Sequence, residues 1–229
     1  MELAFLGTGA AFSLERYNGA VVVDRRFLLD AGAPLLPHMH KLGIDPGDID
    51  AVLVTHYHGD HLLGLPPFML HRAFIAPRPL VILGPPGVEA ALEALMRLAW
   101  GDDWTRDFRS RFNLIYDEAG ARGTLLGVPY ETVPLKHGER TVTGYRLQLG
   151  ELLLAYSGDT EATPALDALV DGADAAIVEA TGPGEPFSHT SWEQAQELAQ
   201  RHPKTRFFFN HVYAGSLDGA VADFEVVTL

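Results

Sequence analysis

The chain contains no cysteine among its 229 residues. Disulfide bonds and thiolate metal ligands are therefore excluded, which fits a reducing cytoplasm. The sequence also has no apolar run long enough to cross a bilayer, and no basic start followed by a short apolar segment. We therefore expect a cytoplasmic protein without a membrane span or a secretion signal.

Basic residues are few, with 17 Lys and Arg against 30 Asp and Glu, which gives a formal net charge of −13. This surplus of negative charge opposes broad electrostatic attraction to nucleic-acid phosphates. A local positive site is still compatible with it, because bound divalent ions bring their own charge. We accordingly expect a small anionic substrate and no extensive nucleic-acid binding.

The remaining composition and the hydrophobic patterning predict one α/β domain over residues 1–229. Apolar residues make up 47% of the chain, which is ample for a core of that size. Short apolar runs predict strands at 2–6, 20–23, 27–29, 51–54, 81–83, 130–134, 143–149, 152–156, 175–178 and 206–209. Helices are predicted at 34–42, 88–98, 164–170 and 192–200. Thr190 and Glu193 have the spacing of a capping box, so Thr190 is expected to begin the last helix.

Four metal-seeking side chains lie within six residues: His56, His58, Asp60 and His61. Two histidines that are two positions apart can point to the same side of an extended segment. The preceding apolar run at 51–54 predicts a buried strand and residues 62–65 lead toward a helix, so the motif lies on a strand-to-helix loop. Imidazole and carboxylate groups are ligands for zinc, manganese or iron. A polar loop without metal is the alternative, and the density of ligand types favours the metal site.

This motif resembles that of the metallo-β-lactamase-fold superfamily, and three further positions follow in the order typical of that family. They are His137 in Pro-Leu-Lys-His-Gly, Asp159 in Tyr-Ser-Gly-Asp-Thr, and His211 in Phe-Asn-His-Val. Three further segments resemble motifs of the tRNase Z and phosphodiesterase-like branch of this superfamily. They are Leu-Gly-Thr-Gly at 6–9, Ser-Gly-Asp-Thr at 157–160 and Ser-His-Thr at 188–190. The resemblance implies an αββα sandwich, with two mixed β-sheets and helices on both outer faces. It also suggests a homodimer.

The resemblance further implies two divalent ions with one shared ligand. Zinc is expected, and manganese or iron are alternatives. The implied ligands of the first ion are His56, His58 and His137, those of the second are Asp60, His61 and His211, and Asp159 bridges both. Such a pair of ions can share a water and lower its pKa toward neutrality, and Asp60 could orient the resulting hydroxide.

His189 is the other predicted catalytic residue. In related phosphodiesterases the matching histidine faces the substrate and assists departure of the leaving group. His189 precedes the expected helix start, where the helix dipole favours a neutral ring; the alternative is a histidine that only packs in the loop. Asp30 either ties down the metal loop or is an ordinary turn aspartate. Glu179 either supports the site or is a solvated loop carboxylate.

The segment 100–112 combines aromatic and basic residues. Its arginines could meet an anionic substrate. Its aromatic residues, Trp100, Trp104, Phe108 and Phe112, lie four apart and predict an amphipathic helix or a dimer surface instead. We favour the second interpretation.

Two departures from the family narrow the predicted function. Zinc β-lactamases carry a cysteine at the position of Asp159, which argues against β-lactam hydrolysis. The tRNA-processing relatives have a long basic arm between the positions of His137 and Asp159, whereas here only residues 138–158 intervene. We therefore predict a dinuclear hydrolase of a small phosphodiester, such as a cyclic nucleotide or a short nucleic-acid fragment. The alternatives are a carboxylic ester, lactone or thioester hydrolase, a tRNase Z-like ribonuclease, and a non-catalytic metal-binding sensor or assembly module.

Overall fold

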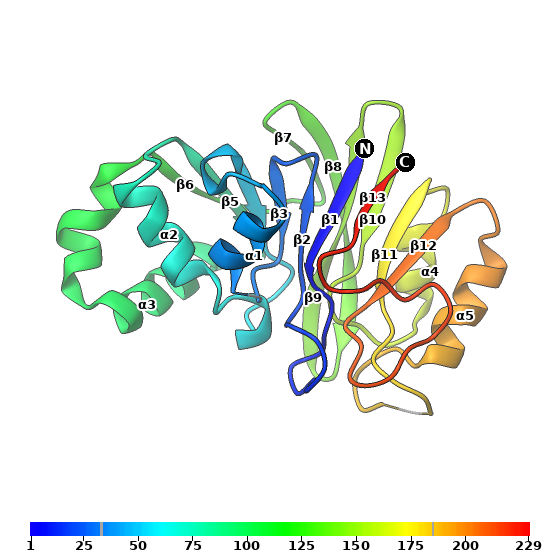
Figure 1. Cartoon of the computed structure of the whole chain (residues 1–229). Helices are drawn as coiled ribbons and strands as arrows, with labels where there is room; N and C mark the ends of the chain where they lie inside the picture. Colours follow the sequence, from blue (N-terminus) through cyan, green and yellow to red (C-terminus); the bar gives the residue numbers. More distant parts are fainter. Residues whose placement is uncertain (33, 185) are drawn as a thin grey trace.

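The computed structural model describes residues 1–32, 34–184 and 186–229. Two β-sheets lie face to face, and helices cover the outer side of each (Figure 1). The predicted αββα sandwich of two mixed sheets is thereby confirmed. None of the described helices is long and apolar enough to cross a membrane.

The first sheet has seven strands in the order β13-β1-β2-β3-β4-β5-β6. Their bounds are β1 Glu2–Gly7, β2 Ala20–Val23, β3 Phe27–Leu29, β4 Ala51–Leu53, β5 Leu80–Gly84, β6 Leu114–Glu118 and β13 Val226–Thr228. Strands β3 to β6 are parallel, while β13, β1, β2 and β3 pair antiparallel. The short runs of valine and leucine in β2, β3 and β4 are fully buried, because both faces of this part of the sheet are covered.

The second sheet has six strands in the order β12-β11-β10-β9-β8-β7. Their bounds are β7 Arg122–Leu125, β8 Val128–His137, β9 Arg140–Leu149, β10 Leu152–Tyr156, β11 Ala175–Glu179 and β12 Arg206–Asn210. Strands β10, β11 and β12 are parallel, and β7 to β10 form an antiparallel meander. The predicted strand 130–134 is the middle part of the longer β8, and the predicted strand 143–149 is the C-terminal part of β9.

Within the described residues, five α-helices connect the strands: α1 Leu35–Lys41, α2 Leu65–Phe74, α3 Val88–Trp100, α4 Pro164–Val170 and α5 Trp192–Arg201. Helices α1 to α3 cover the first sheet, and α4 and α5 cover the second (Figure 1). The apolar core accordingly has three layers. The central layer lies between the sheets and includes the buried Tyr145 and Tyr156, and the other two lie beneath the helices.

The last helix begins at Trp192 as predicted, but its N-cap lies one residue later than expected. Ser191, not Thr190, is its N-cap: the Ser191 hydroxyl accepts from the Gln194 amide, and the Gln194 side chain accepts from the Ser191 amide. The hydroxyl of Thr190 instead donates 2.7 Å to the Thr160 carbonyl. Two overlapping capping patterns are present in the sequence, and the tertiary partner of Thr190 decides between them.

Strands β6, β7 and β13 were not predicted. Charged or exposed residues interrupt each of them, so none shows a continuous apolar run. They lie at the edges of the two sheets, where strands can be polar because one side is solvated.

The segment 100–112 is an irregular helical connection and not one amphipathic helix. Trp104 and Phe112 pack into the core beneath α2 and α3. The Arg106 and Arg109 guanidinium groups form ion pairs with neighbouring carboxylates, and that of Arg111 lies over the ring of Phe74. These arginines have intramolecular partners, so the anionic-substrate interpretation has no support here. The expected single amphipathic helix is wrong, and the dimer surface stays a prediction.

Candidate metal centre

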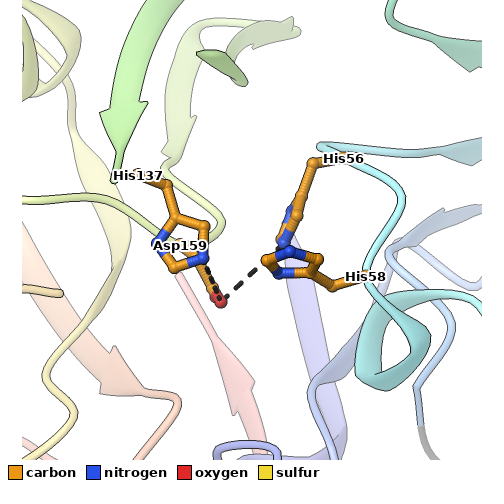
Figure 2. A group of neighbouring side chains, drawn as sticks. All are labelled: His56, His58, His137 and Asp159. Carbon is orange, nitrogen blue, oxygen red and sulfur yellow. Dashed lines mark ion pairs between the residues drawn. The ribbon is translucent and has the colours of Figure 1, made fainter. Parts of the chain in front are cut away.

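Four strand ends of the sandwich bring the seven predicted ligands together. The loop after β4 carries His56 to His61, β8 ends at His137, and the loops after β10 and β12 carry Asp159 and His211. The ligand atoms form two groups, each with atoms within 4.8 Å of one another. Figure 2 shows the first group, His56, His58, His137 and Asp159, with the side chains pointing toward a common centre. The second group consists of Asp60, His61, Asp159 and His211.

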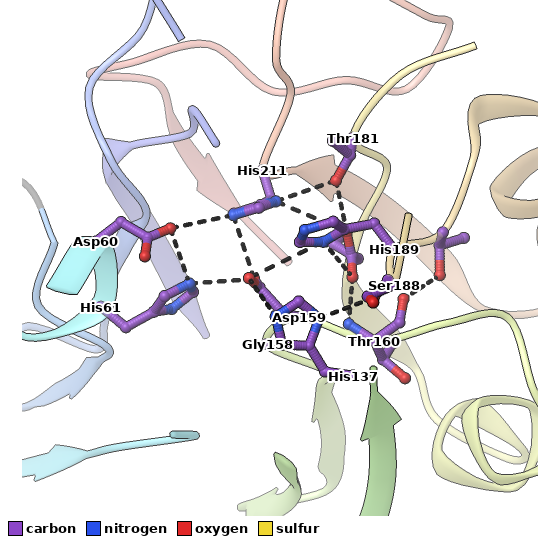
Figure 3. Close-up of polar contacts among 12 residues, drawn as sticks. Asp60, His61, His137, Gly158, Asp159, Thr160, Thr181, Ser188, His189 and His211 are labelled. Atoms are coloured by element: carbon purple, nitrogen blue, oxygen red, sulfur yellow. Dashed lines mark hydrogen bonds and ion pairs between the residues drawn. The ribbon is translucent and has the colours of Figure 1, made fainter. Parts of the chain in front are cut away.

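Asp159 is the side chain that the two groups share. Its Oδ2 lies 3.9 Å from His56 Nε2 and 4.0 Å from His137 Nε2. Its Oδ1 lies 3.1 Å from His61 Nε2 and 3.3 Å from His211 Nε2 (Figure 3). Each carboxylate oxygen therefore faces a different group, which is the arrangement that a carboxylate bridging two cations requires.

Several buried polar atoms in this centre have no hydrogen-bond partner among the described residues. They include Nε2 of His56, Nε2 of His61 and Oδ1 of Asp159. Leaving such atoms buried and unpaired costs free energy, so a partner is expected to reach them. All three are nitrogen or carboxylate donors that face the shared centre. The donor set therefore fits divalent ions such as zinc, manganese or iron.

Four of the five histidines among the candidate ligands are oriented by a hydrogen bond to Nδ1, the ring nitrogen that faces away from the centre. Such contacts fix the ring and present the other nitrogen to a metal. The contacts of Nδ1 are His56 to Thr55 Oγ1 at 3.0 Å, His61 to Asp30 Oδ2 at 2.8 Å, His137 to the Ser188 carbonyl at 2.8 Å, and His211 to Thr181 Oγ1 at 3.1 Å.

Asp30 anchors the metal loop. Its buried carboxylate accepts from the Thr55 amide at 2.8 Å, from the Thr55 hydroxyl at 2.9 Å, from His61 Nδ1 and from the Tyr156 hydroxyl at 2.8 Å. Asp30 has a positive φ of 52°, a backbone conformation that aspartate tolerates better than most residues. Of the two interpretations of Asp30, the structure supports the one in which it ties down the metal loop.

Glu179 is fully buried at the end of β11, so it is not a solvated loop carboxylate. It accepts from the Thr160 amide, from Thr181 Oγ1 at 2.6 Å, and from His189 Nδ1 at 3.0 Å. Burial acts to lower the pKa of His189, but the hydrogen bond and charge of Glu179 outweigh it, so the pKa is raised. The carboxylate of Glu179 therefore acts against the neutral ring that the helix dipole alone would favour.

Buried carboxylates give the centre a strong attraction for cations. Burial acts against the charged form of His211, yet Asp159, Asp60 and Glu179 raise its pKa to about 10. The pKa of His61 is likewise raised, because the carboxylates of Asp159 and Asp30 outweigh the effect of burial. The same carboxylates would favour a divalent cation between these rings, which must then be neutral to coordinate it.

Gly158 fixes the approach of Asp159 to the metal loop. Its φ is +59°, and a Cβ at this position would lie 2.6 Å from Thr55 Oγ1. The backbone of the loop after β10 therefore packs directly against the residue that precedes His56. The supporting residues Thr55, Tyr156 and Thr181 were not predicted, because no sequence pattern connects them to ligands many residues away.

An open cleft of about 850 Å³ adjoins the first group. Its lining includes His58, His137 and His189, and also Arg140 and Phe187. The cleft gives a substrate access to His189, whose side chain is 20% exposed.

Comparison with known proteins identifies the family. The family model described as Anti-Pycsar protein Apyc1 matches residues 1–213. Ribonuclease Z of Methanothermobacter thermautotrophicus is 26% identical over 93% of this chain and 86% of its own length. Ribonuclease Z of Mycobacterium bovis is 30% identical over 77% of this chain and 69% of its own length. The crystal structure of human tRNase Z, short form, superimposes with a TM-score of 0.79 at 21% identity, covering 100% of this chain and 99% of that chain.

The chain thus belongs to the Apyc1 family and to the ribonuclease Z branch of the metallo-β-lactamase-fold superfamily, as the resemblance indicated, and it is a metal-dependent hydrolase. Two expectations need correction. The prediction of a small anionic substrate without extensive nucleic-acid binding is wrong, since the relatives are ribonucleases by name. This prediction relied on the net charge of the whole chain, which does not describe the electrostatic field at the site itself. The comparisons support the ribonuclease alternative better than the leading prediction of a small phosphodiester.

Proposed function

We propose that this protein is a tRNase Z-like ribonuclease that hydrolyses a phosphodiester bond of RNA at a two-ion centre. The observation that carries the proposal is the position of Asp159, whose two oxygens face two separate groups of ligands. The ribonuclease Z relatives supply the substrate class. When bound, two such ions lower the pKa of a shared water and offset the negative charge that develops on the phosphoryl oxygens.

The chain's own residues would divide the binding of the two ions. His56, His58 and His137 would hold the first, and Asp60, His61 and His211 the second, with Asp159 between them. Zinc fits these nitrogen and oxygen donors best, and manganese and iron are the alternatives to test.

Asp60 is placed to orient the attacking water. Its Oδ2 lies 3.4 Å from both His61 Nε2 and His211 Nε2, at the edge of the second group. Burial acts to raise the pKa of Asp60, but the hydrogen bond from His211 and the neighbouring His61 ring bring it well below the ordinary value. Asp60 is therefore ionised at neutral pH and can accept a hydrogen bond from the water.

His189 is placed to protonate the leaving oxygen. It lines the cleft, and its Nδ1 contacts Glu179, which leaves Nε2 as the nitrogen for a substrate. Because Glu179 raises the pKa of His189, the ring can carry the proton that the departing alkoxide needs. Glu179 acts through His189 and is a positioning residue.

The test is cleavage of a structured RNA with a 3′ extension by protein loaded with zinc or manganese. Asp159→Ala should abolish cleavage, and His189→Ala should reduce kcat by roughly 100-fold or more. Lys204→Ala, a surface change, serves as the control. The same preparations are offered 3′,5′-cyclic nucleotides, p-nitrophenyl acetate and a lactone. Turnover of any of these with the RNA left intact would reject the ribonuclease proposal.

A second candidate is the role that the family description states for Apyc1, an action against Pycsar. The observation in its favour is the extent of the match, because residues 1–213 include all seven candidate ligands. Its test is an assay with Pycsar activity as the readout, in which wild type and Asp159→Ala are compared. Equal effects of the two proteins would reject a role that depends on this centre.

A further inference from the structure

An exposed aromatic side chain stands at the edge of the cleft beside His189. The side chain of Phe187 lines the cleft and is 90% exposed. A single exposed apolar residue is ordinary on a protein surface. Phe187 differs from the other exposed apolar residues of the described chain because of its place in the lining of this cleft and because of the backbone that carries it.

The backbone on both sides of Phe187 is tied to the metal centre. The His189 amide donates 3.3 Å to the Pro186 carbonyl and closes a turn around Phe187. The next carbonyl, that of Ser188, accepts from His137 Nδ1 at 2.8 Å, and the His189 side chain is held by Glu179. The aromatic ring is therefore attached to a turn that two residues of the centre hold in position.

The backbone conformation of this turn also indicates that its surroundings hold it in place. Ser188 has a φ of +63°, which a residue with a side chain adopts only when its surroundings impose it. A Cβ at the neighbouring Gly138 would lie 2.9 Å from Ser188 Oγ, so the turn packs closely against the β8–β9 connection. Holding the backbone of Phe187 in advance reduces part of the entropy that a substrate contact would otherwise cost.

A cationic side chain lines the same cleft. Arg140, at the start of β9, lines the cleft together with Phe187. Lys136 also lines it, but its ammonium group is paired with Glu161 at 2.8 Å. A planar guanidinium and an exposed aromatic ring in the lining of one cleft suit a nucleotide, because the phosphate can meet the first and the base can stack on the second.

We propose that Phe187 stacks on the base of the nucleotide next to the scissile phosphate, while Arg140 contacts the phosphate of the same strand. This rests on the proposed phosphodiesterase function and specifies its substrate as a single-stranded segment at the site. Phe187 then discriminates between substrates with and without a base at that position, and Arg140 does not.

The test uses metal-loaded full-length protein and short RNA oligonucleotides that carry either a base or an abasic residue on one or the other side of the scissile bond. Phe187→Ala should raise KM for the base-bearing oligonucleotide by roughly 10-fold, with no change for the oligonucleotide that is abasic at the contacted position. Phe187→Trp should restore the loss. Arg140→Gln should weaken both oligonucleotides equally and reduce the salt dependence of binding.

Leu98→Ala and Arg122→Ala are matched controls, since both side chains are exposed and neither lines the cleft. Binding of a dinucleotide with an uncleavable methylphosphonate linkage is measured in parallel by calorimetry. If wild type cleaves no RNA but Phe187→Ala weakens only the base-bearing dinucleotide, the stacking holds and the ribonuclease proposal fails. If Phe187→Ala changes base-bearing and abasic ligands equally, or changes neither, the stacking is overturned.

Discussion

The phenol of Tyr156 donates a 2.8 Å hydrogen bond to Oδ2 of Asp30, and this contact joins the two sheets directly behind the metal centre. Tyr156 ends β10 in the second sheet, whereas Asp30 follows β3 in the first. The same carboxylate oxygen receives His61 Nδ1. The alignment of the two halves of the centre therefore depends partly on one buried carboxylate.

Removing the phenol of Tyr156 should weaken both the fold and the metal centre. Tyr156→Phe deletes one donor to a buried carboxylate, and we expect a loss of about 1 kcal/mol in the free energy of unfolding. Metal affinity should fall by roughly 10-fold, because Asp30 orients His61 less firmly. Urea unfolding and competition with a chelator measure the two effects.

Tyr145→Phe is the matched control for this variant. Tyr145 is buried in the same central layer, and its phenol donates 2.7 Å to the Val54 carbonyl and not to Asp30. A similar loss of stability with unchanged metal affinity is expected. Equal losses of metal affinity in both variants would contradict the specific role of the Tyr156 contact.

Changing Asp30 should affect metal binding more strongly than changing Tyr156. Asp30→Asn keeps the size of the side chain and suits the positive φ. Its amide NH2 group, however, is a hydrogen-bond donor and would face the N–H and O–H donors that now bind the carboxylate. We expect metal affinity to drop by about 10- to 100-fold. Asp24→Asn is the control, because Asp24 also has a positive φ, of 48°, but is exposed. Retention of wild-type metal content in Asp30→Asn would argue against the anchoring role.

A methyl group at Gly158 should displace the neighbouring Asp159 carboxylate. Gly158→Ala combines a left-handed φ with a clash against Thr55, so we expect a loss of about 3 kcal/mol in stability and reduced metal content. Gly150→Ala has a φ of +65° and open space around the new Cβ, and should cost about 1 kcal/mol with full metal content. Thermal unfolding and metal analysis of the two variants separate the clash from the backbone strain. Equal losses in both would show that the contact with Thr55 is unimportant.

Acid conditions should remove one surface contribution to stability that lies away from the metal centre. A hydrogen bond from His202 at 2.7 Å, supported by Arg201, lowers the pKa of Asp167. Because the carboxyl pKa is lower in the folded state, ionised Asp167 stabilises the fold at pH values above its unfolded pKa of about 4. This contribution disappears as the pH falls through the folded pKa. Since Asp167 is 39% exposed, we expect only about 0.5 kcal/mol.

The comparison of Asp167→Asn with wild type by urea unfolding tests this pH dependence. The variant should be less stable at about pH 7, and the difference should shrink as the pH falls below about 4 and disappear once Asp167 is protonated in the folded state. Asp171→Asn, which removes a more exposed carboxylate 3.9 Å from His202, should show a smaller difference at neutral pH. A difference for Asp167→Asn that stays constant with pH would indicate that it does not arise from ionisation.

The sequence determined the composition of the centre. His56, His58, Asp60 and His61 are adjacent in the chain, so their ligand chemistry is visible as a local pattern, and the motifs around His137, Asp159 and His211 resemble those of a known family. The apolar runs of β2, β3 and β4 also predicted buried strands, because burial on both faces requires continuous apolar residues.

Only the tertiary structure decided how the centre is supported. Asp30 meets Tyr156 across the two sheets, and Glu179 meets His189 from a separate strand, so the protonation of His189 could not be judged from its helix position alone. The edge strands and the start of α5 likewise depended on partners distant in the chain. Local patterns record which side chains are available. Contact distance decides which of them share a hydrogen bond or a charge, because these interactions act over a few ångströms and the fold alone brings remote residues that close.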